Sequence, residues 1–247
     1  MSRDSSPPGG SSRFPPTRRS AVLELGSDDP VARARSFELV VRAYFRPVYG
    51  HVRLRWRRSA DEARELTQAF FAHAYERRYF TTYDPTKSHF RTFLKLCVDR
   101  FVGQEAKRGR RLKRGGAAVL LSLDFESAEA EVGRASAADD PEAHFDRVWV
   151  RVLFDQALAN LHRFCKARDK ERQYRMFAAV ALETDPRARP SYAALAAEHD
   201  VSVIDVTNHL AAMRREFRRI ALVTLRELTA SEDEFRAEAR AIFGIEV

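Results

Sequence analysis

Apolar residues along this chain recur at steps of three and four, and this spacing constrains the fold more than any other feature. Between residues 37 and 56 the apolar side chains are Phe37, Val40, Val41, Tyr44, Phe45, Val48, Val52 and Trp56. The same spacing returns from Phe90 to Phe101 and from Val148 to Phe164. Such steps are typical of the buried face of an α-helix. Nothing alternates with period two over a useful length, so the sequence predicts an all-α protein.

Two local features refine the first helices. Ser59 is followed three residues later by Glu62, and such a pair satisfies two free amides at the start of a helix. The segment 79–87 then breaks the helical period and is predicted to be a loop. Pro47 lies inside the first helical run, where proline removes a hydrogen bond, so the sequence allows a kink or a break there.

The composition changes along the chain and predicts two small helical domains. Residues 1–30 are rich in Ser, Pro, Gly and Arg, and are predicted to form a disordered tail because they bury too little apolar surface. Residues 116–146 are acidic and rich in Ala and Ser, which predicts a flexible linker between helical domains at 31–115 and 147–228. Residues 229–247 carry apolar side chains at helical spacing, which predicts one more short helix.

The stretch 191–219 has the pattern of a helix-turn-helix. A short helix is predicted from Tyr192 to Glu198, then a tight turn, then a helix that Ser202 can cap. At about 100° per residue, the second helix buries the stripe Val203, Val206, Leu210, Met213 and Phe217. Its opposite face carries short side chains first and arginines later, which suits base edges and then phosphates. The candidate DNA-binding residues on this face and its flanks are Ile204, Thr207, Asn208, Ala211, Ala212, Arg214, Arg215, Arg218 and Arg219. An ordinary amphipathic hairpin with a solvated basic face would have the same pattern.

The charge of the chain favours a nucleic-acid partner. The net charge is +8 and the pI is about 9.8, although a merely basic soluble protein would share these values. Cys97 and Cys165 lie far apart, so no disulfide framework is indicated. His162 lies three residues before Cys165, but no second ligand pair accompanies them, so no metal and no cofactor are expected. No apolar run approaches the ~20 residues of a membrane span, and the N-terminus has no apolar signal core. The expectation is therefore a cytoplasmic protein with no membrane partner.

Two parts of the chain resemble the extracytoplasmic-function sigma factors, which are small promoter-recognising subunits of bacterial RNA polymerase. Residues 61–71 (DEARELTQAFF) and 83–94 (YDPTKSHFRTFL), followed by a basic helix, resemble conserved region 2 of that family. Residues 192–210 (YAALAAEHDVSVIDVTNHL), followed by MRR at 213–215, resemble region 4. Both motifs stand in the family's order on either side of an acidic linker. The resemblance implies a sigma factor that binds core RNA polymerase and promoter DNA, and that catalyses no reaction.

The resemblance also implies where these partners bind. The helix at 59–78 would bind core polymerase through Asp61, Glu65 and Gln68. The helix at 202–219 would read the −35 element in the major groove. The loop at 79–89 and the helix after it would melt and read the −10 element, through Tyr79, Phe80, Tyr83, Lys87, Arg91, Lys95, Arg100, Lys107 and Arg108. An anti-sigma factor is a common partner in the family. One departure is the pair His199-Asp200, which replaces the usual apolar-Gly pair in the turn.

Other interpretations stay open from the residues alone. A stand-alone helix-turn-helix transcription regulator would explain residues 190–219, but it gives no reason for the constellation at 61–94. An enzyme is disfavoured because the sequence has no paired carboxylates at metal-ligand spacing and no Gly-rich phosphate loop. The aromatic residues Tyr79, Phe80 and Tyr83 could each stack an unpaired base at ~1–3 kcal/mol, or they could simply fill the domain core.

Overall fold

The computed structural model describes residues 20–107, 123–135 and 140–245, and every regular element in them is helical. The prediction of an all-α protein is therefore confirmed. The elements up to residue 133 are α1 (Ala21–Glu24), α2 (Pro30–Arg55), α3 (Ala60–Glu76), the short 3-10 helix η1 (Tyr79–Thr82), α4 (Phe90–Lys107) and α5 (Phe125–Gly133). The remaining elements are α6 (Pro141–Lys166), α7 (Glu171–Ala181), α8 (Tyr192–His199), α9 (Val203–Glu227) and α10 (Glu232–Phe243).

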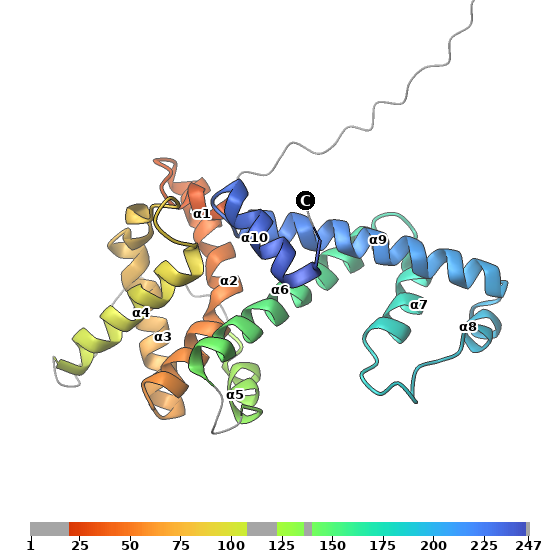
Figure 1. Cartoon of the computed structure of the whole chain (residues 1–247), viewed down its shortest axis with the longest axis horizontal. Helices are drawn as coiled ribbons and strands as arrows, with labels where there is room; N and C mark the ends of the chain where they lie inside the picture. Colours follow the sequence, from red (N-terminus) through yellow and green to blue (C-terminus); the bar gives the residue numbers. More distant parts are fainter. Residues whose placement is uncertain (1–19, 108–122, 136–139, 246–247) are drawn as a thin grey trace, which may run out of the picture.

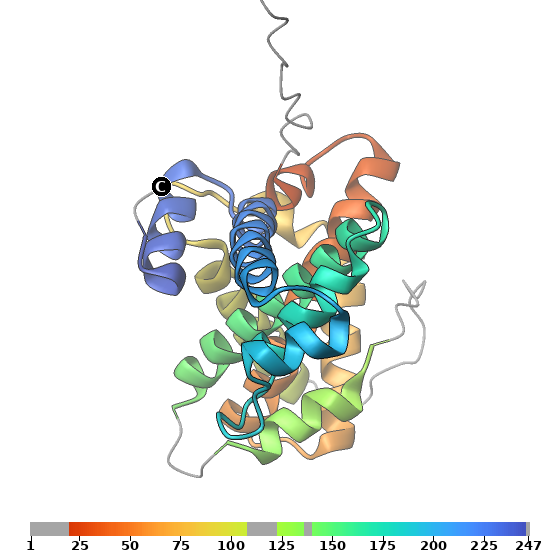
Figure 2. The same ribbon diagram turned by 90° about the vertical axis from the view of Figure 1, so that its right-hand side faces the viewer.

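The molecule is elongated and has two hydrophobic cores, which two long helices connect (Figure 1). The first core is built mainly from α1 to α5, and the second from α7, α8 and parts of the long helices. Helix α6 contributes Phe145 and Trp149 to the first core but Leu161 to the second. Helix α9 does the same, with Leu225 in the first core and Leu210 in the second. Figure 2 looks along the molecule and shows α9 nearly end-on, with α10 beside it.

The predicted flexible linker needs correction, because the described part of 116–146 is folded against the first core. It contains α5 and the first turns of α6, and Phe125 and Phe145 are both buried there. The Tyr49 hydroxyl donates a hydrogen bond of 2.5 Å to Glu129 of α5, and the Arg53 guanidinium binds the same carboxylate at 2.7 Å. The acidic residues that suggested a solvated tether therefore include one that binds basic and phenolic groups of α2.

The ends of the chain also differ in part from the prediction. Residues 1–19 and 116–122, and the predicted linker residues 136–139, lie outside the described residues. Within the predicted N-terminal tail, however, α1 is folded and its Ala21 and Val22 are buried. At the other end, α10 lies where the sequence predicts a short helix.

Helix α2 continues through Pro47 without a break, and it passes close to α6 at Gly50. A Cβ atom added at Gly50 would lie 2.8 Å from Nε2 of His144 on α6, which is closer than Cβ atoms are found to approach other atoms. The His144 side chain is itself buried, so it has little room to move aside. Glycine at this position therefore allows the close contact between α2 and α6.

We expect Gly50→Ala to lower the free energy of unfolding by about 1–3 kcal/mol, the usual cost of overpacking a filled core. Urea denaturation followed by circular dichroism measures this loss. Gly133→Ala is the matched control, because a Cβ at Gly133 meets no atom within 4 Å. Equal stability of the two variants would contradict the close approach of α2 and α6.

Candidate nucleic-acid interface

Helices α8 and α9 form a helix-turn-helix with its turn at residues 200–202. Asp200 ends α8 in the left-handed conformation, with φ 51° and ψ 57°. Aspartate adopts this conformation more readily than most residues other than glycine. The backbone amides of Asp200 and Val201 both donate hydrogen bonds to the carbonyl of Ala196, which closes the helix end. The turn is thus formed with aspartate at its left-handed position.

The start of α9 is fixed by a capping box, as the sequence predicts. The amide of Asp205 donates to the Ser202 hydroxyl at 3.0 Å, and the amide of Ser202 donates to the Asp205 carboxylate at 3.2 Å. The hydrogen bond from the Ser202 side chain lowers the pKa of Asp205, and the backbone hydrogen bond adds to this effect. A charged carboxylate also suits the positive end of the helix dipole. The first turn of α9 is therefore held in one register, and this fixes the direction of the side chains that follow.

The outward face of α9 presents the side chains that the sequence assigns to the −35 element. Ile204 is 72% exposed, and Ala211 and Ala212 are half-buried. Arg219 forms an ion pair of 2.6 Å with Glu216, so its guanidinium is less available to an outside anion than those of the other arginines in the set. The remaining members of the set are exposed, namely Thr207, Asn208, Arg214, Arg215 and Arg218.

The buried face of α9 differs from the prediction at its first residue. Val206, Leu210 and Met213 are buried in the second core, but Val203 is 47% exposed. Val203 is the first residue of the helix and lies at its free end, beyond the cover that the later turns receive. With Ile204, it adds an apolar edge to the first turn of α9.

The three residues assigned to core polymerase are all exposed on α3. Asp61, Glu65 and Gln68 follow one another at steps of four and three, so they share one face of the helix. Glu65 also lines a cleft of about 650 Å³ between α3 and α4, together with Leu66 and Val102. The cleft between α3 and α4 therefore presents carboxylates beside apolar surface.

The aromatic residues assigned to the −10 element are buried in the first core or packed against it. Phe80 is 5% exposed, and its ring centroid lies 5.9 Å from that of Phe37 and 5.7 Å from that of Phe90. It is part of the core, which favours the second of the two roles that the sequence left open for it. Tyr79 and Tyr83 are half-buried, and the Tyr83 hydroxyl donates to the carbonyl of Ser88 at 2.9 Å. Burial also raises the pKa of Tyr83, so its phenol stays neutral.

The basic residues assigned to the −10 element fall into two groups. Lys87, Arg100 and Lys107 are exposed, whereas Arg108 lies outside the described residues. Arg91 and Lys95, in contrast, are engaged by other helices. Arg91 pairs with Asp146 of α6 at 2.8 Å and with Glu238 of α10, and its guanidinium lies 4.2 Å from the centre of the Trp149 ring. Lys95 pairs with Glu142 of α6.

The ion pairs of Arg91 together affect the pKa of its guanidinium more than burial does. Burial lowers the pKa of the guanidinium, but the hydrogen bond to Glu238 and the charges of Glu238 and Asp146 raise it, so the net shift is upward. Arg91 is consequently a fixed cation within a set of anions.

Sequence reasoning missed the carboxylates that cover α4. We call them the acidic cover, and it consists of Glu142 and Asp146 on α6 with Glu234 and Glu238 on α10. Each pair has i,i+4 spacing, as do Arg91 and Lys95, so each set lies on one face of its helix. The charge pattern is visible in the sequence, but the partner of each pair is a tertiary contact that no local pattern encodes.

Neither a metal site nor a membrane span emerges from the described residues. The His162 ring stacks on Tyr174 with centroids 4.5 Å apart, while Cys165 is buried beside Met213. Within the part of the chain that the structure describes, no group of three or more His, Cys, Asp or Glu side chains is placed to hold a metal ion. In the same residues, no helix is both long and apolar enough to cross a membrane.

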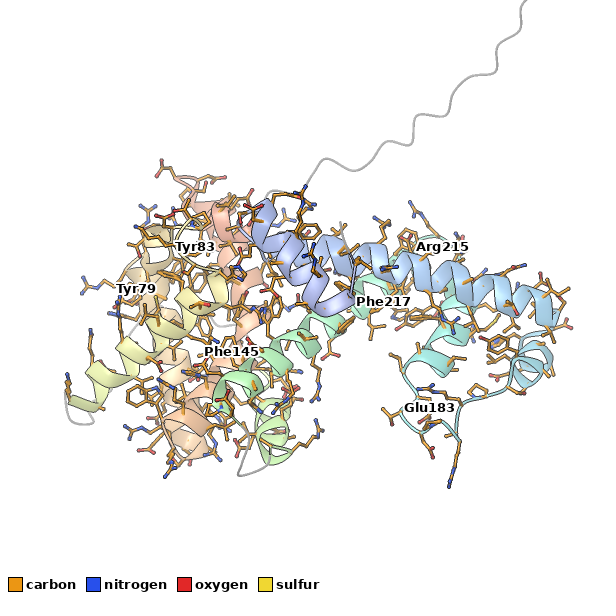
Figure 3. The ribbon with its side chains drawn as sticks, viewed as in Figure 1. Tyr79, Tyr83, Phe145, Glu183, Arg215 and Phe217 are labelled. Atoms are coloured by element: carbon orange, nitrogen blue, oxygen red, sulfur yellow. The ribbon has the colours of Figure 1, made fainter. Side chains whose placement is uncertain are left out.

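The two predicted DNA-binding surfaces lie near different cores. Figure 3 shows Tyr79 and Tyr83 among the helices of the first core, and Arg215 and Phe217 on the part of α9 that extends toward the second core. The surface on α9 is open, whereas part of the surface on α4 is covered by α6 and α10. Comparisons with protein-family models, curated proteins and solved structures find no match to this chain.

Proposed function

We propose that this chain is a sigma factor, which binds core RNA polymerase in the cytoplasm and directs promoter-specific initiation of transcription. Helix α9 would read the −35 element, and the loop before α4 with α4 itself would read and help to melt the −10 element. Core polymerase would bind the exposed face of α3 that carries Asp61, Glu65 and Gln68. The chain would act by binding alone and carry out no covalent chemistry.

The observation that carries this proposal is the helix-turn-helix of α8 and α9 with its ordered outward face. Side chains near the capped start of α9, such as Asn208, are short enough to approach base edges, and Asn can bond adenine bidentately. The arginines that follow suit phosphates, which supply most of the raw affinity by counterion release. The region 2 resemblance at residues 61–94 adds a reason for a polymerase partner.

In vitro transcription with core polymerase over a promoter library tests this function. We expect the chain to co-purify with core polymerase and to select a subset of promoters with a shared −35 sequence. The variant Glu65→Ala with Gln68→Ala should lose polymerase binding, while its α9 should still bind DNA. Transcription that does not depend on the added chain would refute the proposal.

A stand-alone helix-turn-helix regulator is the second candidate, and one observation favours it. The α9 face is open while Arg91 and Lys95 are covered, so in this conformation the helix-turn-helix is the more accessible of the two DNA-binding surfaces. Tight, sequence-specific binding to duplex DNA without polymerase would support the regulator instead.

Two substitutions on α9 should have different effects on the −35 element. We expect Asn208→Ala to cost about 1–3 kcal/mol at one base position, because it removes a base contact. We expect Arg218→Ala, four turns into the helix, to weaken binding evenly and to lower the salt slope by about one, because it removes a phosphate contact. Binding to a set of single-base promoter variants measures both. If the two substitutions shift all variants equally, this orientation of α9 on DNA is wrong.

A further inference from the structure

The turn between α6 and α7 carries exposed basic side chains that the proposed function leaves unused. We call them the corner cations, and they are Lys166, Arg168, Lys170 and Arg172. Asp169 and Glu171 lie between them in the sequence, but none of the four cations forms an ion pair with another described residue. Cations without a carboxylate partner are available to an anion from outside the chain.

The backbone of this turn is fixed to the second core. The amides of Arg168 and Lys170 both donate hydrogen bonds to the carbonyl of Cys165, at 3.1 and 2.9 Å. Asp169 lies between them in the left-handed conformation, with φ 54°, which aspartate adopts more readily than most residues. The sulfur of Cys165 is buried 3.6 Å from that of Met213 on α9. The backbone that carries the corner cations therefore has a defined position beside α9 (Figure 1).

Two interactions place the corner cations along one flank of the outward face of α9. The guanidinium groups of Arg168 and Arg219 lie 4.2 and 6.0 Å from the centre of the Phe164 ring, so the end of α6 meets the arginines of α9 there. Nearer the start of α9, the hydrogen bonds of the capping box lower the pKa of the Asp205 carboxyl, and the charge of Arg172 lowers it further. The corner cations thus border α9 from its first turn to its arginines.

The opposite flank of this face carries arginines of α9 itself. At about 100° per residue, Asp205 and Arg219 lie on one side of Asn208. Arg214 and Arg218 lie on the other side and are exposed. The major groove of B-DNA is about 12 Å wide, and an α-helix with its side chains is about 10–12 Å across. A helix in the groove therefore has one phosphate backbone along each flank, and both flanks of α9 carry cations.

We propose that the corner cations bind the phosphates of one DNA strand while Arg214 and Arg218 bind those of the other strand. The turn between α6 and α7 is thus a second phosphate-binding surface, outside the helix-turn-helix. It reads no bases, because phosphate contacts carry no sequence information directly. It adds affinity and fixes the orientation of α9 in the groove. This inference rests on the proposed function, since it concerns how α9 binds duplex DNA.

A salt titration of the variant R168Q/R172Q tests this surface in the full chain. The measurement is fluorescence anisotropy of a labelled duplex of random sequence, without polymerase. Each lost phosphate contact lowers the slope of log affinity against log salt by about 0.9, so the variant should lose about 1.8. The ratio of wild-type to variant affinity should then grow about 60-fold over a tenfold drop in salt. An unchanged slope would overturn the proposal.

Two control variants separate the phosphate contacts from damage to the fold and from net charge. R168K/R172K keeps both charges, and lysine also binds phosphate, so it should keep most of the slope. A slope as low as that of R168Q/R172Q would instead point to lost packing on Phe164 and would count against the proposal. R35Q/R57Q removes two exposed arginines, one in α2 and one directly after it, and should keep the wild-type slope. An equal fall there would reduce the effect to net charge and overturn the proposal.

Neutral methylphosphonate linkages assign each flank of α9 to a strand. They are placed one at a time along both strands of a duplex with the −35 sequence that transcription selects. The wild-type chain should lose affinity at positions on both strands. R168Q/R172Q should become insensitive at the positions on one strand, and R214Q/R218Q at those on the other. Insensitivity on the same strand in both variants would contradict the two-flank arrangement.

Co-purification of the same variants with core polymerase reports on the proposed function separately. R168Q/R172Q should bind polymerase as the wild-type chain does, because the corner cations bind DNA. A loss of polymerase binding with an unchanged salt slope would assign the corner cations to an acidic protein surface and overturn the proposal. Wild-type polymerase binding and promoter selection with an unchanged slope would refute the corner cations alone.

Discussion

Core RNA polymerase is expected to tighten the binding of this chain to a promoter with both elements by about 10²–10⁴-fold, the range that a second linked contact can add. In the free chain, α6 and α9 each contribute residues to both cores, and this fixes the spacing of the two predicted DNA-binding surfaces. Polymerase binding at α3 would offset the cost of separating the cores and would set the distance between the two surfaces. The second contact then becomes intramolecular and gains effective concentration.

Gel shifts of the chain alone and of the chain with core polymerase measure this gain. A promoter that carries only the −35 element is the control, and polymerase should add much less there. Nanomolar specific binding by the chain alone, unchanged by polymerase, would contradict this prediction and favour the stand-alone regulator.

Phe80→Ala is expected to lower the free energy of unfolding by about 3–5 kcal/mol, the usual cost of truncating a buried phenylalanine. Its ring contacts Phe37, Phe70 and Phe90, so the substitution would leave a cavity among three helices. A loss of this size is a large fraction of the stability of a typical domain. The transcription defect should therefore follow from loss of folded protein.

A thermal melt and two transcription templates distinguish this result from a role in melting DNA. Tyr79→Ala is the matched control, since Tyr79 is a neighbouring aromatic residue but only half-buried. Phe80→Ala should melt at a lower temperature than Tyr79→Ala, and a template with a mismatch bubble at −10 should not restore its activity. Full stability with rescue by the bubble would show instead that the Phe80 ring acts on DNA.

The sequence predicts well what local chemistry determines. The helix-turn-helix follows from helical periodicity, a turn and a capping box, and all three depend on residues within a few positions of one another. Ser59 with Glu62 marks the start of α3 for the same reason. Exposure along α9 is also predicted from the 3.6-residue period, except at Val203, which is exposed, and at Ala211 and Ala212, which are half-buried.

The sequence predicts poorly what distant residues decide. Acidic composition over 116–146 suggested a solvated linker because carboxylates usually face water. Glu129 instead binds Arg53, which lies 76 residues earlier in the chain. For Phe80, the sequence allowed either a stacking or a core role, and its packing against Phe37 and Phe90 favours the core. The acidic cover was likewise missed because its partners on α4 lie far away in sequence.

Helix α9 joins the helix-turn-helix at one of its ends to the first core at the other. Its capped end carries the candidate reading residues, while Leu225 near its other end is held in the first core. A tilt of about 10° at the Leu225 end of a rod ~37 Å long moves the other end by about 6 Å. That displacement approaches two base-pair steps of ~3.4 Å. Under the proposed function, the packing of Leu225 and of α10 would therefore set where the far end of α9 meets the groove.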